Sequence, residues 1–141
     1  MNVDVLIDTG SCFTLIDKKV FDRLQNPTSF ESHVRHIRGL TDVGKEVVGA
    51  TCVDVQFAEN NVMSLTCHVV SDLTYDILLG RDMLKHVLHT INYVDGVVTL
   101  FSTHRRRRLT CDCYVTARQG DDKLTRVMCV SCLSTGKKTS F

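Results

Sequence analysis

The sequence predicts an all-β domain with one or two short helices, followed by a basic tail that carries cysteines. Runs rich in β-branched residues recur through residues 3–101, partly alternate with polar residues and are separated by Gly, Asn or Asp. The charge then changes sign. Residues 1–101 hold 8 basic and 13 acidic residues, a net charge of −5, whereas residues 102–141 hold 9 and 3, a net charge of +6. We therefore expect a domain at 1–101 and a tail at 102–141.

The strand pattern is clearest in five runs, and a further apolar strand is expected just before Gly80. The five runs span residues 3–7, 34–40, 46–57, 63–70 and 96–101. No internal repeat accompanies them.

Two segments depart from the strand period and predict short helices. In the first, Asp17 can cap a turn that Asn26-Pro27 ends. The apolar residues that share a face there are Val20, Phe21 and Leu24. The second helix is expected after Gly80. Its residues at helical spacing are Met83, Leu84, Val87 and Leu88.

Composition limits the classes of protein that fit. No stretch approaches the roughly 20 apolar residues that span a membrane, and no secretory signal is visible, because Asp4 and Asp8 interrupt the N-terminal apolar run. The seven cysteines are an odd number, which argues against a complete disulfide framework. We expect a cytoplasmic protein with reduced thiols or a metal site.

Asp8 is the residue that most needs an explanation. It follows the apolar run "VLI" and precedes Thr9, Gly10 and Ser11. A carboxylate taken out of water without partners costs several kcal/mol, so the chain must supply hydrogen bonds, an opposite charge or a function. Gly10 allows close backbone approach, and N–H groups and the hydroxyls of Thr9 and Ser11 can reach the carboxylate. We expect these residues to support Asp8.

Three segments together resemble the retropepsins, the aspartic proteases of retroviruses and LTR retrotransposons. "VLIDTGSCFTLI" leads from an apolar strand into Asp-Thr-Gly-Ser, and "DILLGRDML" leads from an apolar strand into Gly80, Arg81 and Asp82 and then a helix. Between them, "IRGLTDVGKEVVG" matches the place of the family's glycine-containing flap. The resemblance covers roughly residues 3–101 and is similar in order and spacing to the family pattern.

The resemblance implies a retropepsin-like acid protease barrel and an aspartic endopeptidase that processes a polyprotein. Peptide hydrolysis by carboxylates needs one group to accept a proton from water and another to donate a proton to the substrate carbonyl. This chain holds a single Asp-Thr-Gly, so we expect a homodimer in which two Asp8 residues meet and Thr9 bonds across the interface. No cofactor is expected for catalysis.

The resemblance also implies roles for the flap and for the second motif. The expected flap residues are Gly39, Leu40, Thr41, Asp42, Val43 and Gly44, with an ordinary surface hairpin as the alternative. Arg81 is expected to be structural. Its usual acidic neighbour is replaced by Cys12, so Asp17 or Asp82 is expected to take that place.

One departure from the family pattern leaves an alternative open. Only seven residues precede Asp8, where family members usually carry about twenty, so we expect either a truncated start or dimerisation through other segments. The alternative function is a catalytically inactive module of the same fold that dimerises or binds peptides.

The tail supports a second alternative, a zinc- or nucleic-acid-binding protein that acts through its basic cysteine-bearing segment. A hairpin centred on Asp121 would pair Cys113 with Cys129 and bring Cys111 and Cys132 to the same end, and four thiolates suit tetrahedral zinc. An unmetallated tail and disulfide pairing remain open beside zinc. The arginines are expected to form a solvated linker or a weak nucleic-acid contact. These arginines are Arg105, Arg106, Arg107 and Arg108.

Overall fold

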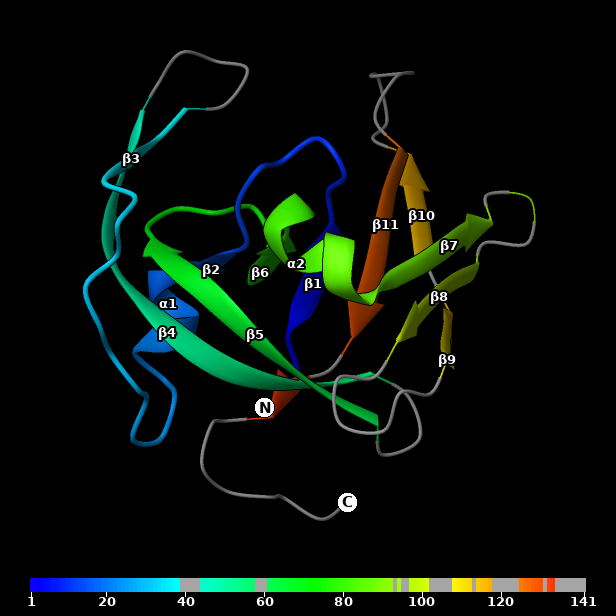
Figure 1. The fold of residues 1–141 in the computed structure, drawn as a ribbon, viewed down its shortest axis with the longest axis horizontal. Coiled ribbons are helices and arrows are strands. Elements are labelled where there is room, and N and C mark those ends of the chain that lie inside the picture. The colour runs from blue at the N-terminus through cyan, green and yellow to red at the C-terminus, as the bar shows by residue number, and fades with distance from the viewer. Residues whose placement is uncertain are drawn as a thin grey trace.

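A computed structural model of the chain describes residues 1–38, 44–57, 61–92, 94, 97–101, 108–112, 114–117, 125–130 and 132–133, and from residue 101 onward it describes the backbone alone. It confirms an all-β fold with two short helices (Figure 1). The elements in chain order are β1 (Asp4–Ile7), β2 (Leu15–Asp17), α1 (Lys18–Phe21), β3 (His36–Ile37), β4 (Lys45–Phe57), β5 (Asn61–Val70), β6 (Ile77–Leu79), α2 (Arg81–Val87), β7 (Leu88–Asn92), β8 (Val97–Phe101), β9 (Arg108–Asp112), β10 (Tyr114–Ala117), β11 (Thr125–Val130) and β12 (Cys132–Leu133).

Within the described residues the strands form two sheets. The larger has nine strands, eight of them in the order β10-β11-β1-β6-β2-β5-β4-β12, with β3 paired to β4 beside them. The smaller is the antiparallel sheet β7-β8-β9. In the larger sheet β1 pairs with β6 in parallel, β2 with β6 antiparallel, and β2 with β5 in parallel. This order places the ends of β1 and β6, which carry the two sequence motifs, side by side.

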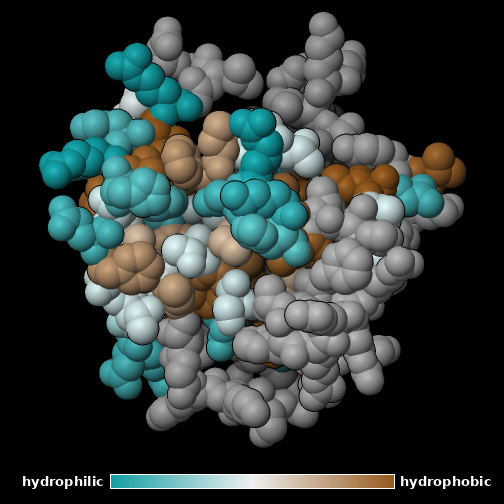
Figure 2. All heavy atoms as spheres, in the orientation of Figure 1, coloured by the Kyte–Doolittle hydropathy of each residue, from teal (hydrophilic) through white to brown (hydrophobic). Residues whose placement is uncertain are grey.

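The long hairpin β4–β5 supplies one wall of the core. Its strands pair antiparallel with a register irregularity between Val47 and Gly49, and Figure 1 shows them curving together past α1. Alternate residues face inward, as the period of a strand requires. The inward residues of β4 and β5 with at most 1 % exposure include Val53, Val55, Met63, Leu65, Cys67 and Val69. Polar side chains cover much of the face seen in Figure 2, and brown apolar atoms lie between them.

Both predicted helices are present, and both are shorter than predicted, since α1 ends at Phe21 instead of reaching Asn26. Asp17 caps α1 by accepting a hydrogen bond from the Lys19 amide, at 2.8 Å, and Val20 is buried. Helix α2 ends at Val87, and Leu88 begins β7 instead of continuing the helix. Of the described residues 34–38 of the expected strand at 34–40, His36–Ile37 form a strand, β3.

Strands on both sides of residue 102 share the larger sheet. Strand β11 pairs antiparallel with β1, and β12 pairs with β4. The β10–β11 pairing joins Tyr114 to Met128, which is the register of a hairpin centred on Asp121, as expected from the sequence. The division of the chain at residue 102 stays a prediction, but backbone pairing crosses it.

No helix in the described part of the chain is long and apolar enough to cross a membrane.

Candidate active site

Asp8 stands where the chain leaves the sheet. Val5 and Ile7 of β1 are buried, and β1 lies between β6 and β11. The Asp8 amide continues the pairing by donating to the Leu79 carbonyl at 3.0 Å, and the Ser11 amide then donates to the Asp8 carbonyl at 3.2 Å. The backbone of Asp8 is therefore fixed by the sheet on one side and by a tight turn on the other, while its side chain is only partly buried.

The Asp8 carboxylate is supported by the backbone of the turn. Its Oδ1 accepts a hydrogen bond from the Gly10 amide at 2.9 Å, and a Cβ on residue 10 would lie 3.2 Å from that oxygen. Glycine thus allows the close approach that the sequence predicts. The expected support from Ser11 was wrong, because its hydroxyl donates to the Phe13 carbonyl instead, at 2.9 Å. Thr9 is exposed at the same turn.

The second motif holds the turn in place through its backbone. The amides of Arg81 and Asp82 donate to the carbonyls of Ser11 and Cys12, at 2.8 and 3.2 Å. Gly80 lies directly against Phe13, where a Cβ would collide with the Phe13 carbonyl. No residue but glycine fits there without moving the turn. The loop after β1 and the start of α2 therefore form one hydrogen-bonded unit.

Asp82 and Thr14 form the centre of that unit. The Asp82 carboxylate accepts from the Thr14 hydroxyl at 2.6 Å, from the Thr14 amide at 3.1 Å and from the Met83 amide at 2.8 Å. The Thr14 hydroxyl in turn accepts from the Gly80 amide at 3.0 Å, and Thr14 is fully buried. Each polar group in this cluster has a partner, as buried polar groups require.

Arg81 does not pair with either of the acids expected to replace its usual neighbour. Asp82 is bound to Thr14, and the carboxylate of Asp17 accepts from the amides of Lys19 and Leu73 at 2.8 Å each. The Arg81 guanidinium instead contacts the Cys12 sulfur, with Nη2 at 2.9 Å from Sγ. This expectation was wrong because both carboxylates already accept hydrogen bonds from backbone amides. Asp17 binds the amides of Lys19 and Leu73, and Asp82 binds those of Thr14 and Met83.

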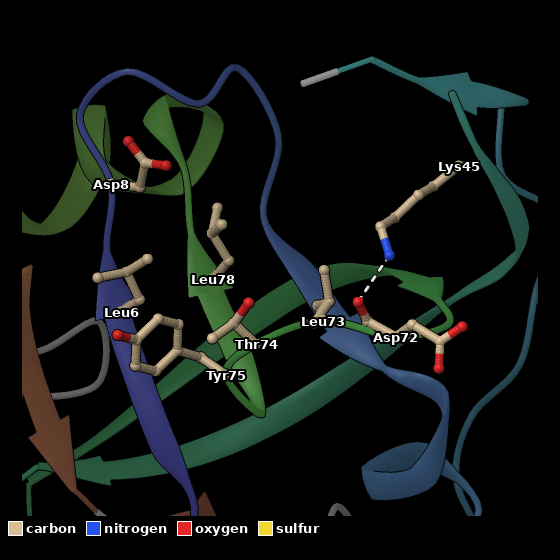
Figure 3. A pocket seen from close by; sticks show the side chains of 8 residues that line it. All are labelled: Leu6, Asp8, Lys45, Asp72, Leu73, Thr74, Tyr75 and Leu78. Atoms are coloured by element: carbon tan, nitrogen blue, oxygen red, sulfur yellow. Dashed lines mark hydrogen bonds between the residues drawn. The ribbon is translucent and has the colours of Figure 1, made fainter. Parts of the chain in front are cut away.

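A pocket of about 240 Å³ opens beside Asp8. Leu6 of β1 and Asp8, which follows this strand, line it together with Leu78 of β6, and the segment before β6 and the first residue of β4 close its other side (Figure 3). The residues that line it from those parts are Lys45, Asp72, Leu73, Thr74 and Tyr75. The pocket thus places the Asp8 carboxylate beside three leucines, with the polar residues Thr74 and Tyr75 and the charged residues Lys45 and Asp72 completing its lining.

His68 is buried behind the same loop, and its amide is bonded to the loop. It is 4 % exposed, its amide donates to the Thr14 carbonyl, and its Nδ1 lies 2.7 Å from the Ser32 hydroxyl oxygen. The rings of Phe13 and His33 pack edge-on against it, at 5.4 and 5.5 Å between centroids. Burial lowers the pKa of His68 below its usual value of 6.5, with a smaller upward effect from Asp82 and a further lowering from His33.

A family model described as "gag-polyprotein putative aspartyl protease" matches residues 1–86, more than half of the chain. The chain belongs to this family. The match includes both the Asp8 turn and the Gly80-Arg81-Asp82 corner, and it confirms the resemblance to the aspartic proteases of retroelement polyproteins. Among curated proteins, none matches the chain.

Some residues of the predicted site lie outside the part of the chain that the structure describes. They include most of the expected flap, from Gly39 to Val43, whereas Gly44 is exposed at the foot of the β3–β4 hairpin. Cys113 and Arg105 to Arg107 also lie outside them. The backbone pairs Cys111 with Val98, Cys129 with Val5 and Cys132 with Val55, without a description of their side chains. The zinc site stays a prediction.

Sequence reasoning missed several residues of the site. Thr14 was not singled out, although a threonine just before a strand is the kind of residue that bonds a nearby helix start. Lys45 was read only as part of the flap segment. Its place at the pocket depends on a contact with the chain 26 and 27 residues later, which no local pattern reveals.

Proposed function

We propose that the protein is an aspartic endopeptidase that cleaves polyprotein substrates as a homodimer, with Asp8 of each copy forming the catalytic pair. The observation that carries this proposal is the position of Asp8. Its carboxylate projects from the end of a buried strand, is held by the Gly10 amide and lines an open pocket to which Leu6, Leu73 and Leu78 contribute apolar surface. Few structural roles require a carboxylate so placed.

The chemistry requires two such carboxylates. When like charges lie about 3 Å apart, only one ionises, so one member of the pair accepts a proton from water while the other donates a proton to the substrate carbonyl. The attacking water and the protonated carbonyl then give a tetrahedral intermediate, whose collapse releases an amine and an acid. A chain with one Asp-Thr-Gly must take its second carboxylate from another copy.

The exposed side of the turn supports the same assembly. Thr9 is exposed in the single chain, beside a partly buried Asp8. In a two-fold dimer we expect Thr9 to bond across the interface and the hairpin β3–β4 to cover the substrate. Water would then be excluded from the reacting atoms.

The test is replacement of Asp8 by asparagine in the full chain. Asp8→Asn should lower peptide cleavage by at least about a hundredfold, because asparagine can neither accept nor donate the required proton. The matched control is Asp22→Asn, which removes a surface carboxylate paired with Lys18 at 2.7 Å. Its cleavage rate should stay close to that of the wild type.

Folding has to be measured beside activity. The urea midpoint of Asp8→Asn should equal or exceed that of the wild type, since Asn preserves the bond to the Gly10 amide. The rate of the wild type should also be bell-shaped in pH, with its maximum on the acid side of neutrality. Retained cleavage in Asp8→Asn would refute the proposed chemistry, and an inactive wild type that binds peptides would favour the non-catalytic module.

A further inference from the structure

Lys45 supplies the positive charge of the pocket beside Asp8. It is the first residue of β4 and is partly buried. It pairs with Ile37, the last residue of β3, next to the connection between the two strands. In Figure 3 its side chain reaches from the β3–β4 hairpin toward the segment that precedes β6, on the opposite side of the pocket from Asp8. The pocket therefore has a carboxylate at one end and an ammonium group at the other.

The ammonium group of Lys45 is held by neutral acceptors. Its Nζ donates to the carbonyl oxygens of Ser71 and Asp72, at 3.0 and 2.6 Å. Asp72 has a φ of 59°, in the left-handed region, so the bend turns both carbonyls toward Lys45. The ion pair found in the described part of the chain joins Lys18 to Asp22 and does not involve Lys45.

Two consequences follow from that geometry. A lysine ammonium has three hydrogens, and the two carbonyls use two of them, which leaves one donor for another group. Carbonyl dipoles hold the position of the ammonium without cancelling its charge, and the Asp72 carboxylate points away from Leu6 and Leu78 in Figure 3. The site is therefore suited to an anionic acceptor.

The rest of the pocket defines the shape of what it accepts. In Figure 3, Leu6 and Tyr75 lie below Asp8, Leu78 and Thr74 lie between them and the bend at Asp72, and Leu73 lies nearest to the bend itself. A side chain that enters beside Asp8 passes the apolar groups of Leu78 and Leu73, with Thr74 beside them, before it meets Lys45. A glutamate side chain fits this order, since it has a short apolar stem and ends in a carboxylate.

We propose that Lys45 is a specificity-determining residue that selects a glutamate side chain in the peptide substrate. The proposal rests on the peptidase function proposed above and adds the class of substrate. Charge-assisted hydrogen bonds are stronger than neutral ones, so the ammonium discriminates glutamate from glutamine, which has nearly the same shape. The bonds to the Ser71 and Asp72 carbonyls fix the position of the Lys45 ammonium before the glutamate carboxylate binds.

The experiment measures peptide binding separately from cleavage. Octapeptides in which one position at a time is fixed as glutamate or glutamine are bound near pH 6 to the full-length Asp8→Asn protein, and the same peptides are offered to the wild type for cleavage. At one position we expect glutamate to bind about fivefold more tightly than glutamine, as one partly exposed charge pair allows.

Substitutions at Lys45 separate charge from structure. Lys45→Arg keeps the positive charge and should retain the preference for glutamate. Lys45→Gln keeps a hydrogen-bond donor without the charge and should lower the glutamate-to-glutamine ratio to about one. Lys19→Gln, which removes an exposed lysine on α1, is the matched control and should leave the ratio unchanged.

The outcomes separate the two proposals. Cleavage or binding without discrimination between glutamate and glutamine at any position overturns the role of Lys45, and so does a preference that survives in Lys45→Gln. Glutamate-selective binding by the Asp8→Asn protein, together with a wild type that cleaves none of these peptides, refutes the peptidase function and leaves the selective site standing. Absence of both binding and cleavage overturns both proposals.

Discussion

Replacement of Thr14 by valine should destabilise the protein, because it removes one buried hydroxyl. The substitution preserves the side-chain shape and removes the oxygen that donates to Asp82 at 2.6 Å and accepts from the Gly80 amide at 3.0 Å. A hydrogen bond to a charged group contributes about 1.5–3 kcal/mol, and a buried amide without a partner costs about 1–3 kcal/mol. Because the two terms share one oxygen and overlap, we expect Thr14→Val to lower the free energy of unfolding by about 3 kcal/mol.

Urea denaturation of a short variant series measures this effect. Thr14→Ser keeps the oxygen and loses one methyl group, so it should cost about 1 kcal/mol. Asp82→Asn keeps an acceptor for the Thr14 hydroxyl but turns an N–H₂ group toward the Thr14 amide, and its cost should lie between the other two. Thr90→Val, at an exposed position on β7, should change the free energy of unfolding by less than about 0.5 kcal/mol.

The series also predicts an effect on activity. Thr14 bonds the loop that carries Asp8 to the start of α2, so loss of the hydroxyl should reduce cleavage even at temperatures where the variant is folded. A Thr14→Val cost no larger than that of Thr14→Ser would show that the methyl packing, and not the hydroxyl network, stabilises this corner.

Three further predictions follow from other parts of the molecule. Burial lowers the pKa of His68 below 6.5 in the folded protein, so the stability that neutral His68 contributes is complete above pH 6.5 and is lost as the pH falls through the folded pKa. The free energy of unfolding of His68→Gln, measured by chemical denaturation, should therefore depend less on pH below 6.5 than that of the wild type. An unchanged pH dependence would contradict this. Deletion of residues 102–141 removes the strand that pairs with β1, so circular dichroism should report a lower melting temperature, whereas an unchanged one would support an independent domain at 1–101. Metal analysis in reducing buffer should find one zinc ion per chain that is lost in a Cys129→Ser, Cys132→Ser variant, and zinc-free wild type would remove the tail site.

The sequence predicts those parts of the fold that depend on local patterns. Four of the five β-branched runs became strands over most of their length, and the cap at Asp17 started α1 as expected. The failures occur where a distant contact overrides a local preference. Helical spacing extends through Leu88, but pairing of that residue with Leu100 of β8 makes it the start of β7 instead. Tertiary hydrogen bonds outweigh the small differences in helix propensity.

The site shows the same limit. The sequence places Asp8 and Gly80 in turns after apolar strands, and the parallel pairing of β1 with β6 brings those turns together. Which side chain bonds to which oxygen could not be predicted, as the Ser11 and Arg81 contacts show. The Arg81–Cys12 contact joins residues 69 positions apart in the chain, and the Ser11–Phe13 bond is set by the detailed backbone path of the turn. Spacing along the sequence carries no such information.

The most direct test of the central claim is a mixing experiment with wild-type protein and the Asp8→Asn variant. Equal amounts of the two proteins are denatured together, refolded at a concentration that favours association, and assayed for peptide cleavage. The reference is a sample with the same total amount of protein in which every chain is wild type. If one active site needs Asp8 from two copies, random pairing leaves about a quarter of the dimers complete, and activity should fall to about a quarter. Activity at about a half would show that each chain acts with its own carboxylate, and would contradict the shared catalytic pair.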